Sequence, residues 1–472
     1  MTTLIPKFDL MNGGTTPLGA INRAINLKLN DMVSVKDFGA TGNGTTDDTA
    51  AIQAALNSSR DIWFPSGSYV ISSSLQLSVT KKIIGESSSA FGSVKNQVKI
   101  LPNGNFPCFI NASGVTGNQY EIRGFNIYWS LTTPTNQTTD GNKYGIYFVL
   151  NGTSQFTAPY SVFADIEVNG GWGVYYDNTD NYLNKFERVV GRYCTNGFYK
   201  RLGTLMHFEE CGNSIGQQGF YFDTTISPIL INCACDTLTP ISTTPGLSGN
   251  YFTNCNSISI MGWDAEGAYI NGSDYSYMNF NNVTGTLSGF TGIGNTLNSA
   301  VGQFVCWFLI TNNSNITISG VNTKFAGTNS LTFTGGSGTS GDVATVRCIA
   351  GSNATIISST LNAPYNGYPT NRYSIYSSGG NITLIDSIWD NQYQIPTRIV
   401  SGNVISTNII ATTNFQFVGA QSYYSGSAAP TTGTYNQGDV VFNTAPTSGG
   451  YIGWVCTAAG TPGTWKTFGL IS

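Results

Sequence analysis

The chain has 472 residues, enough for a large core and more than one domain, yet only 10% of them are charged and the formal net charge is −4. This composition excludes a basic nucleic-acid-binding protein, whose affinity for phosphates depends on clustered Lys and Arg. Abundant Gly, together with frequent aromatic and β-branched residues, is typical of an all-β protein with many short strands and turns. No apolar run approaches the length that spans a bilayer, so we expect no membrane insertion.

The opening stretch "MTTLIPKFDLMNGG" lacks the basic and apolar regions of a signal peptide. Further along, "VKDFGATGNGTTDDTAAIQAAL" contains two adjacent carboxylates, Asp47 and Asp48. The apolar residues that follow them have helical spacing: Ile52, Ala55 and Leu56. The spacing predicts a short helix with Thr46 as its N-cap and both carboxylates in its first turn, where negative charge is favourable. We therefore expect Asp47 and Asp48 to start a helix rather than to form an active site.

Two strands are predicted next, over residues 62–64 and 69–77, with a turn at Pro65-Ser66-Gly67 between them. The stretch "VSVKDFGATGNGTTDDTAAIQAAL", followed by "IWFPSGSYVIS", resembles the N-terminal signature of the pectate-lyase-like right-handed parallel β-helix superfamily, in the form found in bacteriophage tailspikes. The resemblance covers about residues 33–86. It implies an all-β solenoid whose first coil is capped by the short helix, preceded by a lead-in or virion-attachment segment over residues 1–32. It does not fix the chemistry, because one fold serves many functions.

A repeat runs through the middle of the chain. Its first position is Phe or Leu at residues 186, 208, 230 and 252, which makes each step 22 residues (208 − 186). Phe163 and Phe280 extend the series with steps of 23 and 28 residues (186 − 163 and 280 − 252). The fourth position places cysteines in one column: Cys211, Cys233 and Cys255. We expect this column in the core, because a metal site needs convergent ligands and the chain has a single His. No metal or other cofactor is predicted.

A second repeat, Gly-x-Tyr, begins at Gly145, Gly173, Gly197, Gly219 and Gly267. Strand alternation puts the x residues in the core and the tyrosines on the outside as a ladder. The position two residues beyond each Tyr also faces outward and forms a polar column: Val149, Asp177, Arg201, Asp223 and Asn271. Such a surface suits a sugar, whose C–H face packs on an aromatic ring, but a subunit interface is also enriched in Tyr. The candidate substrate-binding residues are Trp172, Tyr175, Tyr199, Tyr221, Tyr269 and Arg201.

Later segments with a shared Asn-x-Thr pattern, such as "NITISGVNTKF" and "NATIISSTLN", predict further coils. From about residue 412 the pattern changes, and "GWVCTAAGTPGTWKTFG" resembles small C-terminal modules of phage tail proteins, which hold a trimer together or bind sugar. The expected domains are a lead-in over 1–32, the β-helix over 33–411 and a C-terminal β module over 412–472.

Because the resemblance implies a polysaccharide substrate, the simplest reaction is glycoside hydrolysis by two carboxyl groups. Their separation is about 5 Å for retention and roughly 6.5–9.5 Å for inversion. Asp177 and Asp223 lie two coils apart in the polar column, which gives a separation of about 9.6 Å because coils stack at about 4.8 Å. Arg201 between them would hold both as carboxylates, which suits a base and opposes an acid. An outward ion-pair ladder without a catalytic role is the alternative.

A second candidate set is Asp264 and Glu266, two residues apart on one side of a strand, with Asp236 joining them from a neighbouring coil. The adjacent Trp263 would raise a carboxyl pKa by desolvation, as a general acid requires. We therefore favour Glu266 and Asp264 as catalysts, although a turn carboxylate bonded to backbone N–H groups would look the same. The single histidine, His207, stands at a strand start and is expected to be structural or exposed.

The expected function is that of a homotrimeric phage tailspike that recognises and hydrolyses a bacterial surface polysaccharide. A metal-free lyase that uses Tyr199, Lys200 or Arg201 as its base remains an alternative, and so does a receptor-binding fibre without enzymatic activity. The expected partners are the polysaccharide, two further copies of the chain and, through the N-terminus, phage tail or baseplate proteins. The expected location is the virion tail, acting at the host surface.

Overall fold

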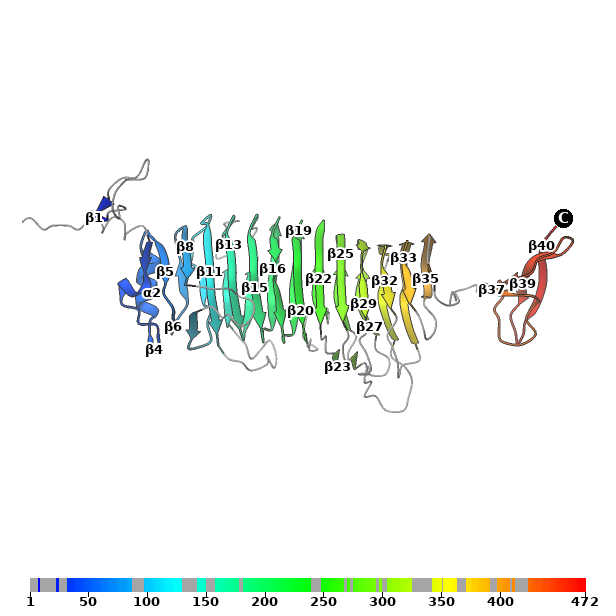
Figure 1. The fold of residues 1–472 in the computed structure, drawn as a ribbon, viewed down its shortest axis with the longest axis horizontal. Coiled ribbons are helices and arrows are strands. Elements are labelled where there is room, and N and C mark those ends of the chain that lie inside the picture. The colour runs from blue at the N-terminus through cyan, green and yellow to red at the C-terminus, as the bar shows by residue number, and fades with distance from the viewer. Residues whose placement is uncertain are drawn as a thin grey trace, which may run out of the picture. The chain divides into compact units, whose positions relative to one another are not determined.

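The computed structural model describes residues 7–8, 23–24, 32–86, 97–129, 142–149, 158–177, 181–238, 248–266, 270–271, 275–293, 297–298, 304–324, 342–349, 351–362, 371–390, 397–407, 410–411 and 423–472. The chain divides into two compact units, Met1–Cys233 and Ala234–Ser472. Within each unit, successive strands pair in parallel, coil after coil (Figure 1). This arrangement confirms the predicted right-handed parallel β-helix. In the described part of the chain, no helix is both long and apolar enough to cross a bilayer.

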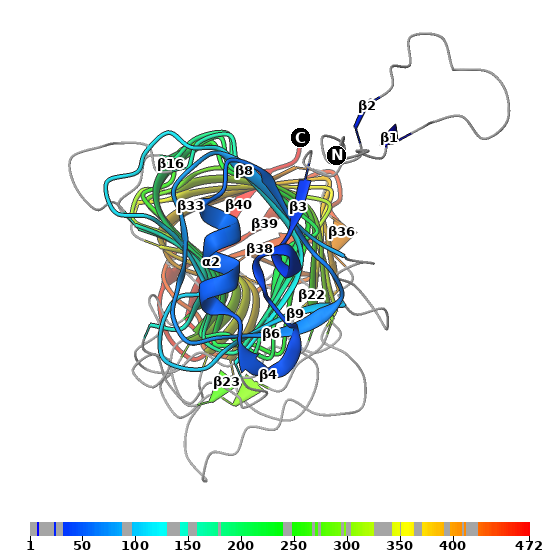
Figure 2. The same ribbon diagram turned by 90° about the vertical axis from the view of Figure 1, so that its left-hand side faces the viewer.

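A short cap begins the first unit. β1 (Lys7–Phe8) pairs antiparallel with β2 (Arg23–Ala24). The elements that follow are β3 (Met32–Ser34), the 3-10 helix η1 (Val35–Phe38), β4 (Asn43–Asp47) and α2 (Thr49–Asn57). Figure 2 shows α2 lying across the end of the coils. Its buried residues are those that the helical spacing predicted, namely Ile52, Ala55 and Leu56.

Asp47 and Asp48 are structural, as expected, but the helix begins later than predicted. Thr46 lies in β4, and α2 begins at Thr49 with Asp48 as its N-cap residue. The Asp48 carboxylate turns back to accept hydrogen bonds of 2.7 and 3.0 Å from backbone amides of the glycine-rich turn before it. The Asp47 carboxylate accepts a 2.6 Å bond from the Ser72 hydroxyl in the following coil. Both carboxylates therefore join the cap to the first coils.

The predicted strand over residues 69–77 is in fact two strands, β6 (Gly67–Ile71) and β7 (Leu75–Leu77). The chain turns a corner between them because the Ser72 amide donates to the Thr49 hydroxyl at the helix start. The other strands of the first unit are β5 (Asp61–Phe64), β8 (Lys81–Gly85), β9 (Val98–Pro102), β10 (Phe109–Asn111), β11 (Tyr120–Tyr128), β12 (Tyr144–Val149), β13 (Val162–Asn169), β14 (Trp172–Asp177), β15 (Lys185–Arg192), β16 (Asn196–Thr204), β17 (His207–Glu209), β18 (Gly212–Ser214) and β19 (Gln218–Ile226). The next strand, β20 (Ile229–Asp236), begins in the first unit and ends in the second.

The 22-residue repeat marks one corner of each coil. Its first residues stack in the core, with ring centroids 5.0 Å apart for Phe163 and Phe186 and 4.8 Å apart for Phe186 and Phe208. Its third residues adopt left-handed backbone angles, with φ between 50° and 53°, at Asp165, Arg188, Glu210 and Asn232. That conformation bends the strand so that the fourth residue points inward again. The cysteines predicted for the core, Cys211, Cys233 and Cys255, are accordingly buried.

The glycine of Gly-x-Tyr is required by the close approach of successive coils. A Cβ atom added to Gly173 would lie 2.2 Å from the carbonyl oxygen of Gly197, and one added to Gly197 would lie 2.9 Å from that of Gly219. The described x residues are buried, as predicted: Ile146, Val174, Phe198 and Phe220. Ala268 lies outside the described residues.

The second unit continues the same construction. Its β-helix strands are β21 (Ser248–Thr253), β22 (Ile258–Glu266), β23 (Ile270–Asn271), β24 (Tyr275–Asn281), β25 (Thr284–Ile293), β26 (Leu297–Asn298), β27 (Phe304–Thr311), β28 (Asn315–Ser319), β29 (Asn322–Lys324), β30 (Asp342–Ile349), β31 (Asn353–Ile357), β32 (Thr360–Asn362), β33 (Asn371–Ile385), β34 (Ile388–Asp390), β35 (Thr397–Thr407) and β36 (Ile410–Ala411). The Asn-x-Thr segments pair in register, Asn315 with Asn353 and Asn353 with Asn381. The Asn381 side-chain amide donates to that of Asn353 at 3.0 Å, so the repeated Asn forms a ladder.

A separate four-stranded sheet forms the C-terminal module. It consists of β37 (Tyr423–Gly426), β38 (Val440–Asn443), β39 (Tyr451–Ala458) and β40 (Thr464–Leu470). β37 and β38 are parallel, whereas β39 is antiparallel to both β38 and β40. The coil repeat therefore does not continue into this module.

The glycine column leads to a stability prediction. Gly173→Ala places a methyl group against a backbone carbonyl that cannot move without shifting the next coil, and overpacking of this kind costs about 1–3 kcal/mol. We expect a clearly lowered melting temperature in a thermal scan. Thr286→Ala, at an exposed outward position of β25, is the control and is expected to change stability by less than about 0.5 kcal/mol. Equal melting temperatures for the two variants would contradict the explanation of the Gly-x-Tyr repeat.

Candidate functional site

The predicted tyrosine ladder is present on the outside of the first unit. Tyr147, Tyr175, Tyr199 and Tyr221 lie on β12, β14, β16 and β19, in register from strand to strand. Their ring centroids are 5.2, 4.5 and 4.6 Å apart, and the planes of neighbouring rings differ by only 14°, 7° and 4°. All four side chains are partly exposed. The fifth expected member, Tyr269, lies outside the described residues.

The stacking of the tyrosine rings determines which parts of the ladder a ligand can contact. Each inner ring is covered on both faces by its neighbours, at centroid distances near van der Waals contact. A pyranose therefore has no access to the face of Tyr175 or Tyr199, which corrects the expectation that sugar rings pack flat on these side chains. What the ladder presents outward is its ring edges and phenolic hydroxyl groups.

Trp172 supports the ladder from within. It was expected to contact substrate, but it is only 9% exposed and packs edge-on against Tyr175 and Tyr199, with centroids 5.7 and 5.9 Å away. The alternation of side chains along a strand explains this position, because Trp172 lies two residues before the inward-facing Val174.

By the same alternation Lys200 points inward, where it is 2% exposed and its ammonium group lies 5.2 Å from the ring centroid of Tyr176. Lys200 is therefore badly placed to act as a base on a bound glycan.

The polar column next to the ladder contains one described ion pair. Arg201 and Asp223 are register partners on β16 and β19, and the Arg201 Nε atom lies 3.9 Å from the Asp223 carboxylate. The Thr224 hydroxyl donates to the same carboxylate at 2.9 Å. Asp177 is placed at the end of β14 by its pairing with Val149, but its side chain is outside the described residues. The structure thus places Asp223 two residues from Tyr221 on the outer face.

The second carboxylate set lies in the second unit. Asp264 is exposed on β22, whereas Trp263 points inward and donates a 3.1 Å hydrogen bond from its Nε1 atom to the buried Tyr277 hydroxyl. Trp263 and the exposed Asp264 therefore face opposite sides of the strand, so Trp263 does not cover the Asp264 carboxyl group as the sequence argument assumed. Asp236 is partly exposed at the end of β20, while the side chain of Glu266 is outside the described residues.

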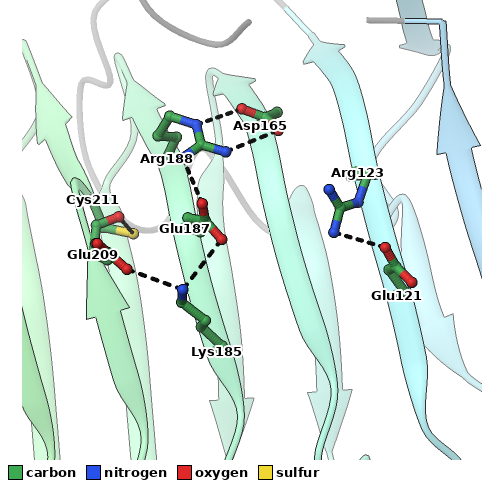
Figure 3. Close-up of polar contacts among 8 residues, drawn as sticks. All are labelled: Glu121, Arg123, Asp165, Lys185, Glu187, Arg188, Glu209 and Cys211. Atoms are coloured by element: carbon green, nitrogen blue, oxygen red, sulfur yellow. Dashed lines mark hydrogen bonds and ion pairs between the residues drawn. The ribbon is translucent and has the colours of Figure 1, made fainter.

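Sequence reasoning missed a network of charged side chains on another face of the first unit (Figure 3). The Arg188 guanidinium binds Asp165 in the preceding coil through two bonds of 2.7 and 3.2 Å and also binds Glu187 at 2.6 Å. Lys185 lies 3.3 Å from Glu187 and 3.0 Å from Glu209 in the following coil. Alternating charges therefore connect β13, β15 and β17. The signal was present in the repeat, since Asp165 and Arg188 both occupy its left-handed third position.

The network lowers the pKa of Glu187. The hydrogen bond from Arg188 is the largest cause; burial opposes it, and the charges of Arg188 and Lys185 add to the lowering. The bond to Glu209 raises the pKa of Lys185. A carboxylate stabilised in this way makes a poor general acid. No cluster of three or more potential metal ligands occurs within the described ranges. We therefore interpret the network as ion pairs that connect neighbouring coils.

His207 lies on β17 beside Lys185 and belongs to the same face.

Comparisons with known proteins connect the first coils to carbohydrate-active families. Residues 32–136 match the family model described as rhamnogalacturonase A/epimerase, pectate lyase-like. The chain is 36% identical over 89 residues to a probable glucan endo-1,3-beta-glucosidase of Arthroderma benhamiae, which covers 17% of this chain and 10% of that protein. It is 31% identical over 125 residues to the pre-neck appendage protein of Bacillus phage B103, which covers 26% and 13%. The chain thus spans only about a tenth of the length of these relatives.

Among solved structures, a tailspike of Acinetobacter phage vb_AbaP_AS12 superposes with a TM-score of 0.53 at 14% sequence identity. The superposition covers 82% of this chain and 63% of the tailspike. Similarity at this level of identity reflects a shared fold. The fold of the chain is therefore the parallel β-helix that the resemblance implied, and its residues 32–136 are similar to the pectate-lyase-like family model.

The charged network predicts a pH-dependent contribution to stability. Because the pKa of folded Glu187 lies below its unfolded value of about 4.3, the ionised network stabilises the fold above that pH. The contribution is lost as the pH falls through the lower, folded pKa. We expect Glu187→Gln to lower the melting temperature by roughly a few degrees at neutral pH and by a smaller amount at an acid pH below about 4. Glu210→Gln, at the exposed corner of the next coil, is the control. A constant difference between Glu187→Gln and wild type at both pH values would contradict the assignment.

Proposed function

We propose that the protein is a bacteriophage tailspike that binds a bacterial surface polysaccharide and cleaves it by hydrolysis. The fold shared with a tailspike supports this role, and so does the partial sequence similarity to a phage pre-neck appendage protein and to a probable glucan endo-1,3-beta-glucosidase. The substrate would be a capsule, an exopolysaccharide or an O-antigen. Three copies would associate, and the N-terminal segment would attach them to the phage tail.

The observation that carries the proposal is the ladder of Tyr147, Tyr175, Tyr199 and Tyr221. The ladder repeats one chemical group at nearly constant spacing over four coils. A surface that repeats one chemical group suits a ligand that also consists of repeating units, such as a polysaccharide. Because the ring faces are covered, the phenolic hydroxyls would exchange hydrogen bonds with sugar hydroxyls while the ring edges contact the C–H groups. Trp172 behind the ladder keeps the rings in place.

For cleavage we assign the role of base or nucleophile to Asp223. Its carboxylate lies 3.9 Å from the Arg201 Nε atom and accepts a bond from the Thr224 hydroxyl, and a carboxylate held in this way can accept a proton or attack the anomeric carbon. It also lies beside the ladder, on the same outer face. The preference for Asp264 and Glu266 depended on desolvation by Trp263, whose side chain faces away from the exposed Asp264. Asp177 is the residue we assign as the second carboxyl group, from its place at the end of β14.

A receptor-binding fibre without catalysis is the second candidate, and one observation favours it. Asp223, which is paired with Arg201, is the one carboxylate of the polar column whose side chain the structure describes, so the described part of this column holds no second carboxyl group to act as the acid. Mass spectrometry of the products from a panel of bacterial polysaccharides separates the two functions. Cleavage products would support an enzyme, and ultraviolet absorbance of an unsaturated uronate among them would indicate a lyase. Binding without any product would favour the fibre.

The contact through hydroxyl groups can be tested at Tyr199. Tyr199→Phe keeps the stacked ring but removes the hydroxyl, so we expect binding to a cleavable polysaccharide to weaken by about three- to tenfold, the effect of one lost hydrogen bond. KM should rise more than kcat falls. Tyr193→Phe, at a partly exposed turn outside the ladder, is the matched control. Wild-type affinity of Tyr199→Phe would show that the hydroxyl of this ring does not contact the glycan.

The catalytic assignment can be tested by removing the charge of each candidate in turn. We expect Asp223→Asn to lower kcat by about 10²–10⁴-fold, with folding and polysaccharide binding retained. Asp264→Asn, Glu266→Gln and Asp236→Asn keep the shape of their side chains and are expected to remain near wild type. If one of these three abolishes turnover while Asp223→Asn stays active, the catalysts belong to the second unit.

A further inference from the structure

One corner of the second unit is rich in asparagine. The coils that contain β21, β24 and β27 carry three asparagines each, within residues 248–257, 275–284 and 304–315. None of these three segments contains a charged residue. The coils are neighbours, because Thr253 pairs with Asn281 and Asn281 pairs with Thr311. We call the side chains that gather where these strands end the asparagine corner: Asn254, Asn281, Asn282 and Asn312.

Hydrogen bonds between side chains hold the asparagine corner from coil to coil. The Asn312 amide donates to the Asn281 carbonyl oxygen at 2.7 Å, and the Asn281 amide donates to the Tyr251 hydroxyl at 2.7 Å. The Asn282 amide donates to the Asn254 carbonyl oxygen at 2.9 Å. Each amide has two N–H groups and an oxygen with two lone pairs. The exposed Asn282 and Asn312 therefore keep a second N–H group and a carbonyl oxygen for a ligand.

The left-handed backbone of this corner does not by itself explain its asparagines. Asn254, Asn282 and Asn312 have φ angles of 52°, 56° and 52°, which Asn adopts more readily than most residues. Leu202 and Thr224 stand at the same place in coils of the first unit, three residues after the Tyr of Gly-x-Tyr, and have φ angles of 60° and 54°. Because the corner also forms with Leu or Thr, the repeated amides point to a role in binding.

The groups that the corner presents suit an uncharged sugar. An amide both donates and accepts hydrogen bonds, as a hydroxyl group does, so neighbouring hydroxyls of a glycan can bond to it in pairs. The three segments offer no counter-charge for a carboxylate, sulfate or phosphate group. The amides recur at about 4.8 Å from coil to coil, which suits a ligand built from repeating units. The partly exposed Tyr251 ring adds an apolar surface for C–H groups.

We infer that the asparagine corner is a binding site for a neutral glycan, separate from the tyrosine ladder. Asn282 and Asn312 bond to the glycan hydroxyls, while their bonds to Asn254 and Asn281 hold the amides in place before the ligand arrives. Amides held in this way lose little conformational freedom on binding. The inference goes beyond the proposed function, because it concerns the second unit and requires neither the ladder nor cleavage.

Affinity electrophoresis of the full-length protein tests the inference. Native gels contain dextran, laminarin or galactomannan as neutral probes, or polygalacturonate as an acidic one. We expect at least one neutral probe to retard wild type. Asn282→Gly combined with Asn312→Gly removes both amides, while Gly adopts left-handed angles without strain, so the affinity should fall by about tenfold or more. Asn232→Gly, at an exposed left-handed Asn outside the corner, is the matched control and should bind as wild type does.

Hydrogen exchange of wild type adds a measurement that needs no variant. The retarding polysaccharide is expected to slow exchange in residues 275–284 and 304–315. Circular dichroism verifies the folding of each variant, and if the double variant does not fold, Asn282→Gly alone should weaken binding by about threefold.

Three results would overturn the inference: no retardation by any neutral probe, equal retardation of wild type and the double variant, or protection confined to β14, β16 and β19. If Tyr199→Phe abolishes retardation while the double variant does not, the glycan lies on the ladder, and the inference fails while the proposed function stands. Binding that survives Tyr199→Phe and is lost in the double variant supports the inference, whatever the cleavage assays show.

Discussion

The constant register between parallel strands of successive coils is the constraint on which this structure depends. A parallel ladder at fixed register sets equivalent positions directly beside one another, so a residue repeated once per coil becomes a column. The Phe163, Phe186 and Phe208 rings stack in the core for this reason, and the Tyr ladder forms outside for the same reason. Left-handed residues such as Arg188 keep the register by bending every coil at the same place. The glycines of Gly-x-Tyr allow the coils to approach closely.

The same constraint shapes what the surface can do. Stacking at 4.5–4.6 Å covers the ring faces of the inner tyrosines, so the ladder offers a row of ring edges and hydroxyls instead of open aromatic platforms. Charged residues in neighbouring coils also come within bonding distance, which connects the coils through Arg188 and Lys185 and lowers the pKa of Glu187. A β-helix thus gains stability and presents repeating binding surfaces easily. It requires a special environment to keep one carboxyl group protonated.

Sequence reasoning was sufficient for the features that repeat. Spacing and parity predicted the solenoid, the buried x residues and the tyrosine ladder, because each depends only on strand alternation and coil length. Sequence reasoning failed where the contacts of a side chain depend on a bend in the strand or on the side of the strand that it faces. The bond between Arg188 and Asp165 depends on the left-handed bend at both residues. Trp172 is buried because it lies two residues before Val174 and therefore faces the same, inner side of the strand. The assumed contact of Trp263 with Asp264 failed because adjacent residues of a strand face opposite sides.

We propose that the tyrosine ladder is the surface that holds a bacterial polysaccharide. An experimental structure of the protein with an oligosaccharide from a recognised polysaccharide would test this proposal. We expect sugar units along Tyr147, Tyr175, Tyr199 and Tyr221, in contact with ring edges and hydroxyl groups, with a glycosidic bond close to Asp223. An oligosaccharide bound only on another face, or a ladder buried against a second copy of the chain, would contradict it.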